Sequence, residues 1–238
     1  MSEHQKARLA ASVILLRAAQ PRGFEVFLTR RPEGMAFLGG MYCFPGGTLR
    51  REDCTEGMLR RSSGLTARAA RTIVGAHFTP NEALGLWVTG IRELFEEVGV
   101  LLAVNEKGEY WLSNGNRHRL EPNRAALLAG SMTFRSVLEN QGLLCDASSL
   151  TSFSRWQTPA RFSMRFDTRF FLAVLPPGQT PFPISPEVIH SLWLIPDRAL
   201  QLVAKDELPM IFPTFASLRT LADFETLEGV VKEFRHEK

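Results

Sequence analysis

One segment of the sequence, residues 92–100 (Arg-Glu-Leu-Phe-Glu-Glu-Val-Gly-Val), constrains the fold more than any other. In an α-helix, Glu93, Glu96 and Glu97 stand at positions i, i+3 and i+4, so their carboxylates are neighbours on one face. Apolar residues recur at mostly three- and four-residue steps over residues 84–98 and predict the buried side of the same helix. The segment therefore predicts an amphipathic helix that gathers three negative charges at one place.

Both ends of this helix carry recognisable signals. Thr79 is a candidate N-cap, Pro80 suits the first helical position, and Glu82 would complete a capping box with Thr79. Gly99 is a natural stop because glycine adopts the left-handed conformation that ends many helices. We therefore expect a helix over residues 80–98.

The residues alone leave two interpretations of the three glutamates open. A solvated acidic face is common on amphipathic helices and needs no ligand. Clustered carboxylates also suit Mg²⁺ or Mn²⁺, hard cations that take oxygen ligands and keep several waters while they contact substrate phosphates. The turn at residues 44–47 (Phe-Pro-Gly-Gly) favours the second interpretation, because its glycines let the backbone approach a ligand or an ion closely.

Together these two segments resemble the signature of the Nudix hydrolase family, G-x5-E-x7-R-E-U-x-E-E-x-G-U, in which U is a bulky apolar residue. Gly47 would open the signature, and residues 92–100 match every specified position of its second half. The first acidic position falls on Asp53 when it is counted from Gly47, and on Glu52 when it is counted from Gly46. In this chain 38 residues separate Asp53 from the second half where the signature has seven, so an insertion splits it.

One branch of the family, that of a peroxisomal coenzyme A diphosphatase, has an insertion at the same place. Residues 156–159, 165–168 and 170–172 resemble that branch too, and the likeness extends from about residue 27 to residue 193. The branch signature L-L-T-x-R-[SA]-x3-R-x3-G-x3-F-P-G-G is partly met, with matches at Leu28, Thr29, Arg31, Gly40 and residues 44–47, and departures at Phe27, Pro32 and Ala36. The resemblance is thus to the family as a whole and, within it, to this branch.

The resemblance implies an α/β fold, the Nudix-type α/β/α sandwich around a mixed sheet, with helical insertions. We expect a single Nudix hydrolase domain over residues 1–238, with one insertion at about 54–84 and a helical one at about 116–146. Strands are expected at residues 11–17, 24–30, 152–158, 166–175 and 188–194, strand and turn at 100–112, and helices at 197–203 and 213–234. Buried positions of the helical insertion are expected at Leu120, Leu127, Leu128, Phe134, Val137 and Leu138.

By resemblance, Glu96 and Glu97 are the principal metal ligands, and Glu93 is a further ligand or a water-activating residue. The carbonyl of Gly47 would complete the shell. Such an ion would neutralise a diphosphate, lower the pKa of an attacking water and align it with the leaving group.

Two further residues take catalytic roles by resemblance. Arg92 would form an orienting ion pair with Asp53, although it could instead neutralise Glu96 one turn away. Glu187 resembles a loop glutamate that some family members use as an additional ligand or general base. A surface-turn role explains Glu187 nearly as well.

Substrate phosphates need cations that can fork onto two oxygens, which arginine does better than lysine. The candidates are Arg30, Arg31, Arg50, Arg161, Arg165 and Arg169. Arg31 and Arg165 are preferred because they lie in stretches shared with the coenzyme A branch. We also expect residues 64–76 and 116–146 to wall the substrate pocket, because they bracket the acidic helix in sequence.

The resemblance implies Mg²⁺- or Mn²⁺-dependent hydrolysis of the diphosphate in a nucleoside diphosphate derivative, with coenzyme A or acyl-coenzyme A as the leading substrate. NADH, ADP-ribose and capped RNA remain alternatives within the enzyme class. A non-catalytic Nudix module that binds a nucleotide is the alternative from another class. Erosion of the glutamate cluster would mark such a module, and here the cluster is whole.

The composition and net charge of the chain limit the kinds of molecule that it is expected to bind. With 45% hydrophobic and 22% charged residues, the 238-residue chain has the balance of a soluble globular protein. A net charge of +3 and a pI of about 9.0 favour a small anionic substrate but fall short of a nucleic-acid-binding signature. The apolar stretch at residues 9–16 is too short to cross a bilayer, and three scattered cysteines suggest neither zinc nor disulfides. We expect a cytoplasmic protein.

Overall fold

The computed structural model describes residues 6–110, 117–183 and 185–235. Its strands are β1 (Arg8–Ala18), β2 (Phe24–Arg30), β3 (Tyr42–Cys43), β4 (Gly46–Thr48), β5 (Ser62–Ser63), β6 (Ala103–Asn105), β7 (Leu143–Asp146), β8 (Thr151–Gln157), β9 (Phe166–Val174) and β10 (His190–Leu194). Its α-helices are α1 (Glu56–Leu59), α2 (Ala67–Val74), α3 (Pro80–Val98), α4 (Arg117–Leu128), α5 (Phe134–Gln141), α6 (Pro196–Ala204), α7 (Phe212–Leu221) and α8 (Leu227–Phe234). Two short 3-10 helices, η1 (Arg51–Cys54) and η2 (Ala147–Ser149), complete the elements.

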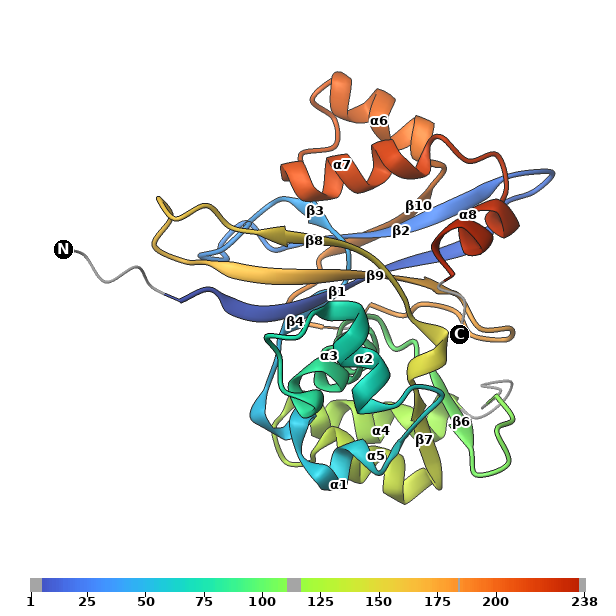
Figure 1. Ribbon diagram of the computed structural model, residues 1–238. Helices are drawn as coiled ribbons and strands as arrows, with labels where there is room; N and C mark the ends of the chain where they lie inside the picture. The colour runs from blue at the N-terminus through green and yellow to red at the C-terminus, as the bar shows by residue number, and fades with distance from the viewer. Residues whose placement is uncertain (1–5, 111–116, 184, 236–238) are drawn as a thin grey trace.

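The elements form three layers (Figure 1). The central mixed sheet has the order β10-β2-β1-β9-β8, with β3 beside β2 and β4 beside β1. Strands β1 and β9 are parallel, whereas the other pairs of this sheet are antiparallel. Helices α6 to α8 cover one face and helices α1 to α5 lie on the other, as Figure 1 shows. The predicted α/β sandwich is confirmed.

Helix α3 begins and ends where the sequence predicts. The Thr79 hydroxyl accepts a hydrogen bond from the amide of Glu82, and the Glu82 carboxylate accepts one from the amide of Thr79, which is a complete capping box. Gly99 ends the helix with φ +71°. Residues 80–84, which we assigned to the insertion, are therefore the first turn of α3.

The apolar side of α3 packs directly on the sheet. Trp87 is buried and lies 4.7 Å from Phe171 of β9, measured between ring centroids. A Cβ atom at Gly90 would lie 3.1 Å from Val13 of β1, so this glycine permits a close approach of helix and sheet. The indole of Trp87 also donates a hydrogen bond to the carbonyl of Leu150. These contacts fix the height of the acidic face above the sheet.

The opposite layer departs from the sequence prediction at one place. Residues 213–234 form two helices, α7 and α8, instead of one. Thr226 starts α8 because its hydroxyl accepts a hydrogen bond from the amide of Gly229. Leu218, Leu221 and Val230 from these helices are buried in one cluster with residues of β1, β2 and β9.

A second sheet, which the sequence did not predict, joins one strand from each insertion to β6, the strand that follows α3. Its order is β5-β7-β6, with β5 parallel and β6 antiparallel to β7. Residues 143–146 are therefore a strand, although we expected helix up to residue 146. Leu128 is exposed, whereas the other five expected core positions of this segment are buried. The prediction for residues 100–112 is met by β6 at Ala103–Asn105, and residues 111 and 112 lie outside the described residues.

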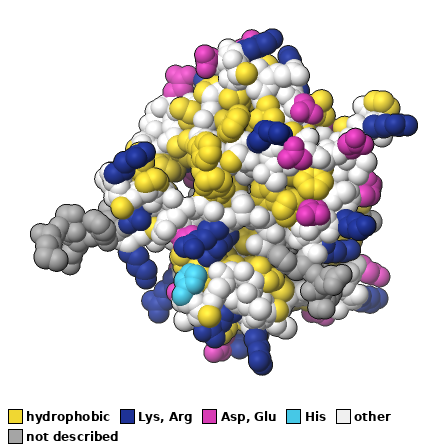
Figure 2. Space-filling view, turned by 45° about the horizontal axis from the view of Figure 1, so that its top comes forward, with side chains coloured by type: hydrophobic (Ala, Val, Ile, Leu, Met, Phe, Trp, Pro, Cys, Tyr) yellow, Lys and Arg dark blue, Asp and Glu magenta, His cyan; other side chains and the backbone are white. Residues whose placement is uncertain are grey.

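Apolar side chains are also visible at the surface. Figure 2 shows them gathered in the upper part of that view, over the layer that contains α6 and α7. Phe212, at the start of α7, is well exposed and meets the ring of Trp156 edge-on, with 5.4 Å between the centroids. Across the described parts of the chain, no helix has the length and hydrophobicity that a bilayer span requires.

Candidate active site

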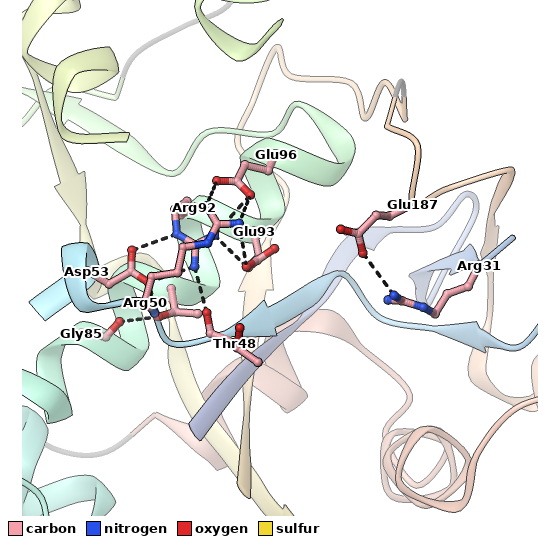
Figure 3. A network of polar contacts seen from close by, with 10 residues as sticks. Arg31, Thr48, Arg50, Asp53, Gly85, Arg92, Glu93, Glu96 and Glu187 are labelled. Atoms are coloured by element: carbon pink, nitrogen blue, oxygen red, sulfur yellow. Dashed lines mark hydrogen bonds and ion pairs between the residues drawn. The ribbon is translucent and has the colours of Figure 1, made fainter. Parts of the chain in front are cut away.

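Arg92 lies at the centre of a buried polar network on α3 (Figure 3). Only 2% of this residue is exposed, yet its guanidinium is well supplied with acceptors. Its Nε and Nη2 donate to the two carboxylate oxygens of Asp53 at 2.8 and 2.9 Å. Its Nη1 donates to Glu93 at 2.7 Å and to Glu96 at 3.2 Å, and Nη2 also donates to the carbonyl of Thr48. Arg92 thus sets the positions of two glutamates at once.

The predicted pair of Arg92 and Asp53 is confirmed as a contact. Asp53 is buried in η1 and also accepts hydrogen bonds from the Thr89 hydroxyl at 2.9 Å and from the amide of Arg50 at 3.0 Å. Its neighbour Glu52 is exposed, which resolves the ambiguity of the first acidic position in favour of Asp53. The two halves of the split signature therefore meet in space.

Electrostatics within this network are dominated by burial and charge pairing. Burial works to lower the pKa of Arg92, but its hydrogen bonds with Asp53 and the charges of Asp53, Glu93 and Glu96 outweigh burial and raise it. The guanidinium consequently stays charged at every ordinary pH.

All three glutamates are buried, with 7%, 5% and 4% exposure for Glu93, Glu96 and Glu97. Their burial excludes the interpretation that the three glutamates form a solvated acidic face of the helix. Burial raises the pKa of Glu93, against the opposing charge of Arg92. Burial also raises the pKa of Glu97 well above its ordinary value, and the charges of Glu93 and Glu187 raise it further. A divalent cation would offset this crowded negative charge, so the donor chemistry of the cluster fits Mg²⁺ or Mn²⁺.

The glycine turn lies against these carboxylates. A Cβ atom on Gly47 would collide with the carboxylate of Glu93, and one on Gly46 would collide with the carbonyl of Ala11 in β1. The Gly46 amide also donates a hydrogen bond to Glu97, which partly lowers the pKa of that carboxyl. Glycine is therefore required at both positions by packing, and β4 is held beside the cluster by its pairing with β1.

Arg50 covers the cluster on one side. Its Nη1 and Nη2 donate to Oε1 and Oε2 of Glu96, both at 2.9 Å, and it lies 3.9 Å from Glu93. Both oxygens of Glu96 are thus hydrogen-bonded to arginines. In the described parts of the chain, no group of three or more His, Cys, Asp or Glu side chains is arranged so that it could hold a metal ion. Because 47% of the Arg50 side chain is exposed, it has room to swing away and free Glu96.

A second arginine–carboxylate pair faces the cluster from the opposite side. Arg31 Nη2 donates to Glu187 at 3.1 Å, and the Glu187 side chain is 52% exposed. Figure 3 shows this pair apart from the Arg92 network. Both charges nevertheless act on Glu97, because Glu187 raises its pKa and Arg31 lowers it. The structure therefore brings Arg31, Arg50 and Glu187 around the predicted glutamates.

Arg30 and Arg165 have hydrogen-bond partners outside the glutamate cluster. Arg30 lies on the sheet face opposite α3, together with Leu28, because side chains alternate along β2. Its Nε donates to the carbonyl of Gly40, and its Nη2 pairs with Glu33. The prediction that Arg30 joins the site is therefore not supported by its position. Arg165 lies at the turn between β8 and β9, where its Nε donates to the carbonyl of Thr158.

The sequence prediction missed Arg124 of α4. This buried arginine donates to the main-chain carbonyls of Glu96 at 3.0 and 3.1 Å, of Glu97 at 2.8 Å and of Phe182 at 2.8 Å. Carbonyls in the last turn of a helix have no partners within the helix, and a cation there is favoured by the helix dipole. Arg124 therefore caps the helix that carries the glutamates and ties it to the segment that leads to Glu187. No local signal in the sequence distinguishes it from the surrounding arginines.

A cavity of about 430 Å³ opens beside the network. It is lined by Arg50, Glu52, Asp53, Thr55, Met58, Arg92, Leu127, Gly130, Met132, Thr133, Phe134, Arg135, Ser136 and Glu139. One wall thus comes from η1 and α1, in place of the expected residues 64–76. The other wall comes from the end of α4 and from α5, within the expected residues 116–146.

Comparisons with known proteins agree with this geometry. The human acyl-coenzyme A diphosphatase NUDT19 is 27% identical over 91% of this chain and 65% of its own length, and the Gallus gallus protein of that name is 26% identical over 94% and 70%. This chain thus spans slightly less than two thirds of the human relative. A crystal structure of a NUDIX hydrolase from Alicyclobacillus acidocaldarius has a TM-score of 0.74 and 28% identity, over 95% of this chain and 96% of that one.

The family match covers most of the chain. A family model described as the NUDT19 Nudix domain matches residues 7–221, a range that includes both halves of the split signature and both insertions. The resemblance inferred from the glycine turn and the glutamate helix is confirmed. This chain therefore belongs to the Nudix family, and within it to the NUDT19 Nudix domains.

Proposed function

We propose that this chain hydrolyses the diphosphate linkage of a nucleoside diphosphate derivative with the help of a divalent cation, and that coenzyme A or acyl-coenzyme A is its substrate. The observation that carries the proposal is the complete set of buried carboxylates, Glu93, Glu96 and Glu97, next to the glycine turn. The names of the human and chicken relatives support the choice of substrate.

Within this proposal, Glu96 and Glu97 hold Mg²⁺ or Mn²⁺, Glu93 serves as a further ligand or activates the water, and the Gly47 carbonyl adds an oxygen donor. The bound ion supplies charge neutralisation at the phosphates and a lowered pKa for the attacking water. Arg92 orients Glu93 and Glu96, because its hydrogen bonds restrict the rotation of both side chains and hold their carboxylates in one arrangement.

The arginines around the cluster bind the substrate in this proposal, with Arg50 half exposed and Arg31 largely buried. Arg50 donates two parallel hydrogen bonds to Glu96, and the same bidentate geometry suits a phosphate. Arg50 can therefore exchange Glu96 for the substrate diphosphate when Glu96 binds the ion. Arg31 offers a second fork on the side of Glu187. Glu187 is the candidate for general base or additional ligand. Its side chain is half exposed, and its charge acts on Glu97 by raising the pKa of that carboxyl.

The test is hydrolysis by the purified protein. We would incubate it with coenzyme A, an acyl-coenzyme A, NADH, ADP-ribose and a capped RNA, each with Mg²⁺, with Mn²⁺ and with a chelator. The expected result is metal-dependent formation of adenosine 3′,5′-bisphosphate and 4′-phosphopantetheine from coenzyme A. Hydrolysis of only another compound would replace the substrate. Nucleotide binding without any metal-dependent hydrolysis would indicate a non-catalytic module.

We further propose a reducing compartment, the cytoplasm, as the site of action. All three cysteines are free thiols, and burial raises the pKa values of Cys43 and Cys54 to about 11. Structural thiols of this kind suit a compartment that keeps them reduced. Cell fractionation with an antibody against the protein would test the assignment, and recovery in a membrane-bounded organelle would overturn it.

A further inference from the structure

The cavity between the two insertions is part of the same polar network. Its wall includes Arg50, Asp53 and Arg92, which also contact one another or the glutamates. Arg50 therefore has one side toward Glu96 and the other toward the cavity. A molecule whose phosphates contact Arg50 would have its next atoms at the cavity entrance.

The cavity lining is mixed and carries no net charge. Apolar side chains line it, namely Met58, Leu127, Met132 and Phe134, together with the polar residues Thr55, Thr133 and Ser136. Its charged residues balance, with Arg50, Arg92 and Arg135 opposite Glu52, Asp53 and Glu139. A neutral, flexible chain with a few amide groups suits such a lining, whereas a further phosphate would find no excess of positive charge.

One contact holds the two walls together. The Arg135 guanidinium lies directly on Gly57 of α1, where a Cβ atom would collide with it, and its Nε donates to Glu139 at 2.7 Å. The contact links α5 of one insertion to α1 of the other. The cavity volume of about 430 Å³ falls within the range of roughly 300–1,000 Å³ that is usual for small-molecule sites.

We propose that this cavity binds the uncharged, amide-bearing arm of the substrate, the pantetheine chain, on the side of Arg50 away from the glutamates. The inference rests on the proposed function, since it assigns one half of coenzyme A to the space between the insertions. The charged adenosine half then lies outside the cavity. The two insertions would thereby give the common Nudix site its preference for this class of substrate.

The test separates the two halves of the substrate. During coenzyme A hydrolysis, 4′-phosphopantetheine reports the arm and adenosine 3′,5′-bisphosphate reports the nucleotide half, each measured as a competitive inhibitor. Met132→Trp fills the cavity, so the inhibition constant of 4′-phosphopantetheine should rise about tenfold or more, while that of adenosine 3′,5′-bisphosphate stays within about twofold. Met132→Ala removes contacts and should raise the first constant by about threefold.

Leu128→Trp is the matched control, because Leu128 lies on the same insertion but is exposed and absent from the cavity lining. It should leave both constants unchanged. Equal rises of both constants in Met132→Trp, or no rise in either Met132 variant, would overturn the assignment. Absence of coenzyme A hydrolysis in the unmodified protein would instead refute the proposed function. Calorimetric binding of 4′-phosphopantetheine would then still show whether the cavity takes the arm.

Discussion

Two arginine–carboxylate pairs flank the same three glutamates, and they differ in burial far more than in distance. Arg92 and Asp53 are each 2% exposed and lie 2.8 Å apart, whereas Arg31 and Glu187 lie 3.1 Å apart with side chains that are 15% and 52% exposed. A buried pair is costly to break because the remaining charge has lost its water, while an exposed pair exchanges partners cheaply. The inner pair therefore fixes the glutamates, whereas in the outer pair Glu187 can change partners at the surface and Arg31, largely buried, would meet a substrate from its present place.

The largest effect is expected inside the cluster. Glu97→Gln removes an oxygen donor at the most deeply buried of the three glutamates, so hydrolysis should fall about a thousandfold while the fold persists. Steady-state kinetics together with circular dichroism measure this. A loss below about tenfold would show that Glu97 is not a ligand.

The next effect concerns the inner pair itself. Arg92→Met leaves Asp53 buried without its partner and should lower the free energy of unfolding by about 3–5 kcal/mol. Urea denaturation measures the change. Adding Asp53→Asn should recover part of it, because the stranded charge is removed. Equal losses in the single and double variants would show that packing, not charge, dominates the inner pair.

A smaller loss is expected at the cap of α3. Arg124→Met removes donors to three carbonyls and should lower the free energy of unfolding by about 1–3 kcal/mol. It should also weaken Mn²⁺ binding, measured by electron paramagnetic resonance, because the last turn of α3 loses its support. Arg219→Met is the control, since Arg219 pairs with Asp223 on an exposed helix face. Unchanged Mn²⁺ affinity in Arg124→Met would limit this residue to stability.

The burial of Glu97 also predicts a pH dependence. Its pKa in the folded state is raised above the ordinary value of 4.5, so protonation favours folding. Without metal, the contribution of Glu97 to the free energy of unfolding should be fully present below pH 4.5, the ordinary pKa of the group. It should be lost as the pH rises through the raised pKa of the folded state. Urea denaturation in chelator across this range measures the effect. Glu97→Gln should flatten the dependence, whereas the exposed Glu52→Gln should not.

The smallest effect is expected at the outer pair. Glu187→Gln should change the free energy of unfolding by less than about 1 kcal/mol, because the side chain is half exposed. Hydrolysis should fall about tenfold, as the charge near Glu97 is lost. A fall of about tenfold fits the role of additional ligand proposed for Glu187, and a fall beyond about a hundredfold would favour the role of general base instead.

Local signals explain what the sequence predicted well. Thr79, Pro80, Glu82 and Gly99 act within a few residues of themselves, so both ends of α3 could be predicted. The division between α7 and α8 has a local signal as well, in the hydroxyl of Thr226, but the apolar spacing obscured it.

Contacts distant in sequence explain what was missed. Arg124 binds main-chain carbonyls 27 to 58 residues away, and main-chain acceptors leave no trace in side-chain patterns. Strands β5 and β6 span two and three residues, too few to show a period. Arg30 is the last residue of β2 and Arg31 follows it directly. Their side chains point to opposite sides of the sheet, because successive residues of an extended chain alternate, and a match to a family signature does not show this alternation.

The split signature has a consequence for how the site is assembled. Bringing Asp53 to Arg92 closes a loop of 38 residues where the family signature has seven, which costs about 1.5 kcal/mol more in chain entropy by the logarithmic loop law. Pairing of β5 with β7 joins that loop to chain beyond α3. The contact between Asp53 and Arg92, which helps to position the carboxylates, therefore depends on how the 38 residues between them pack. We expect local opening of that segment to disturb the carboxylates while the central sheet stays folded.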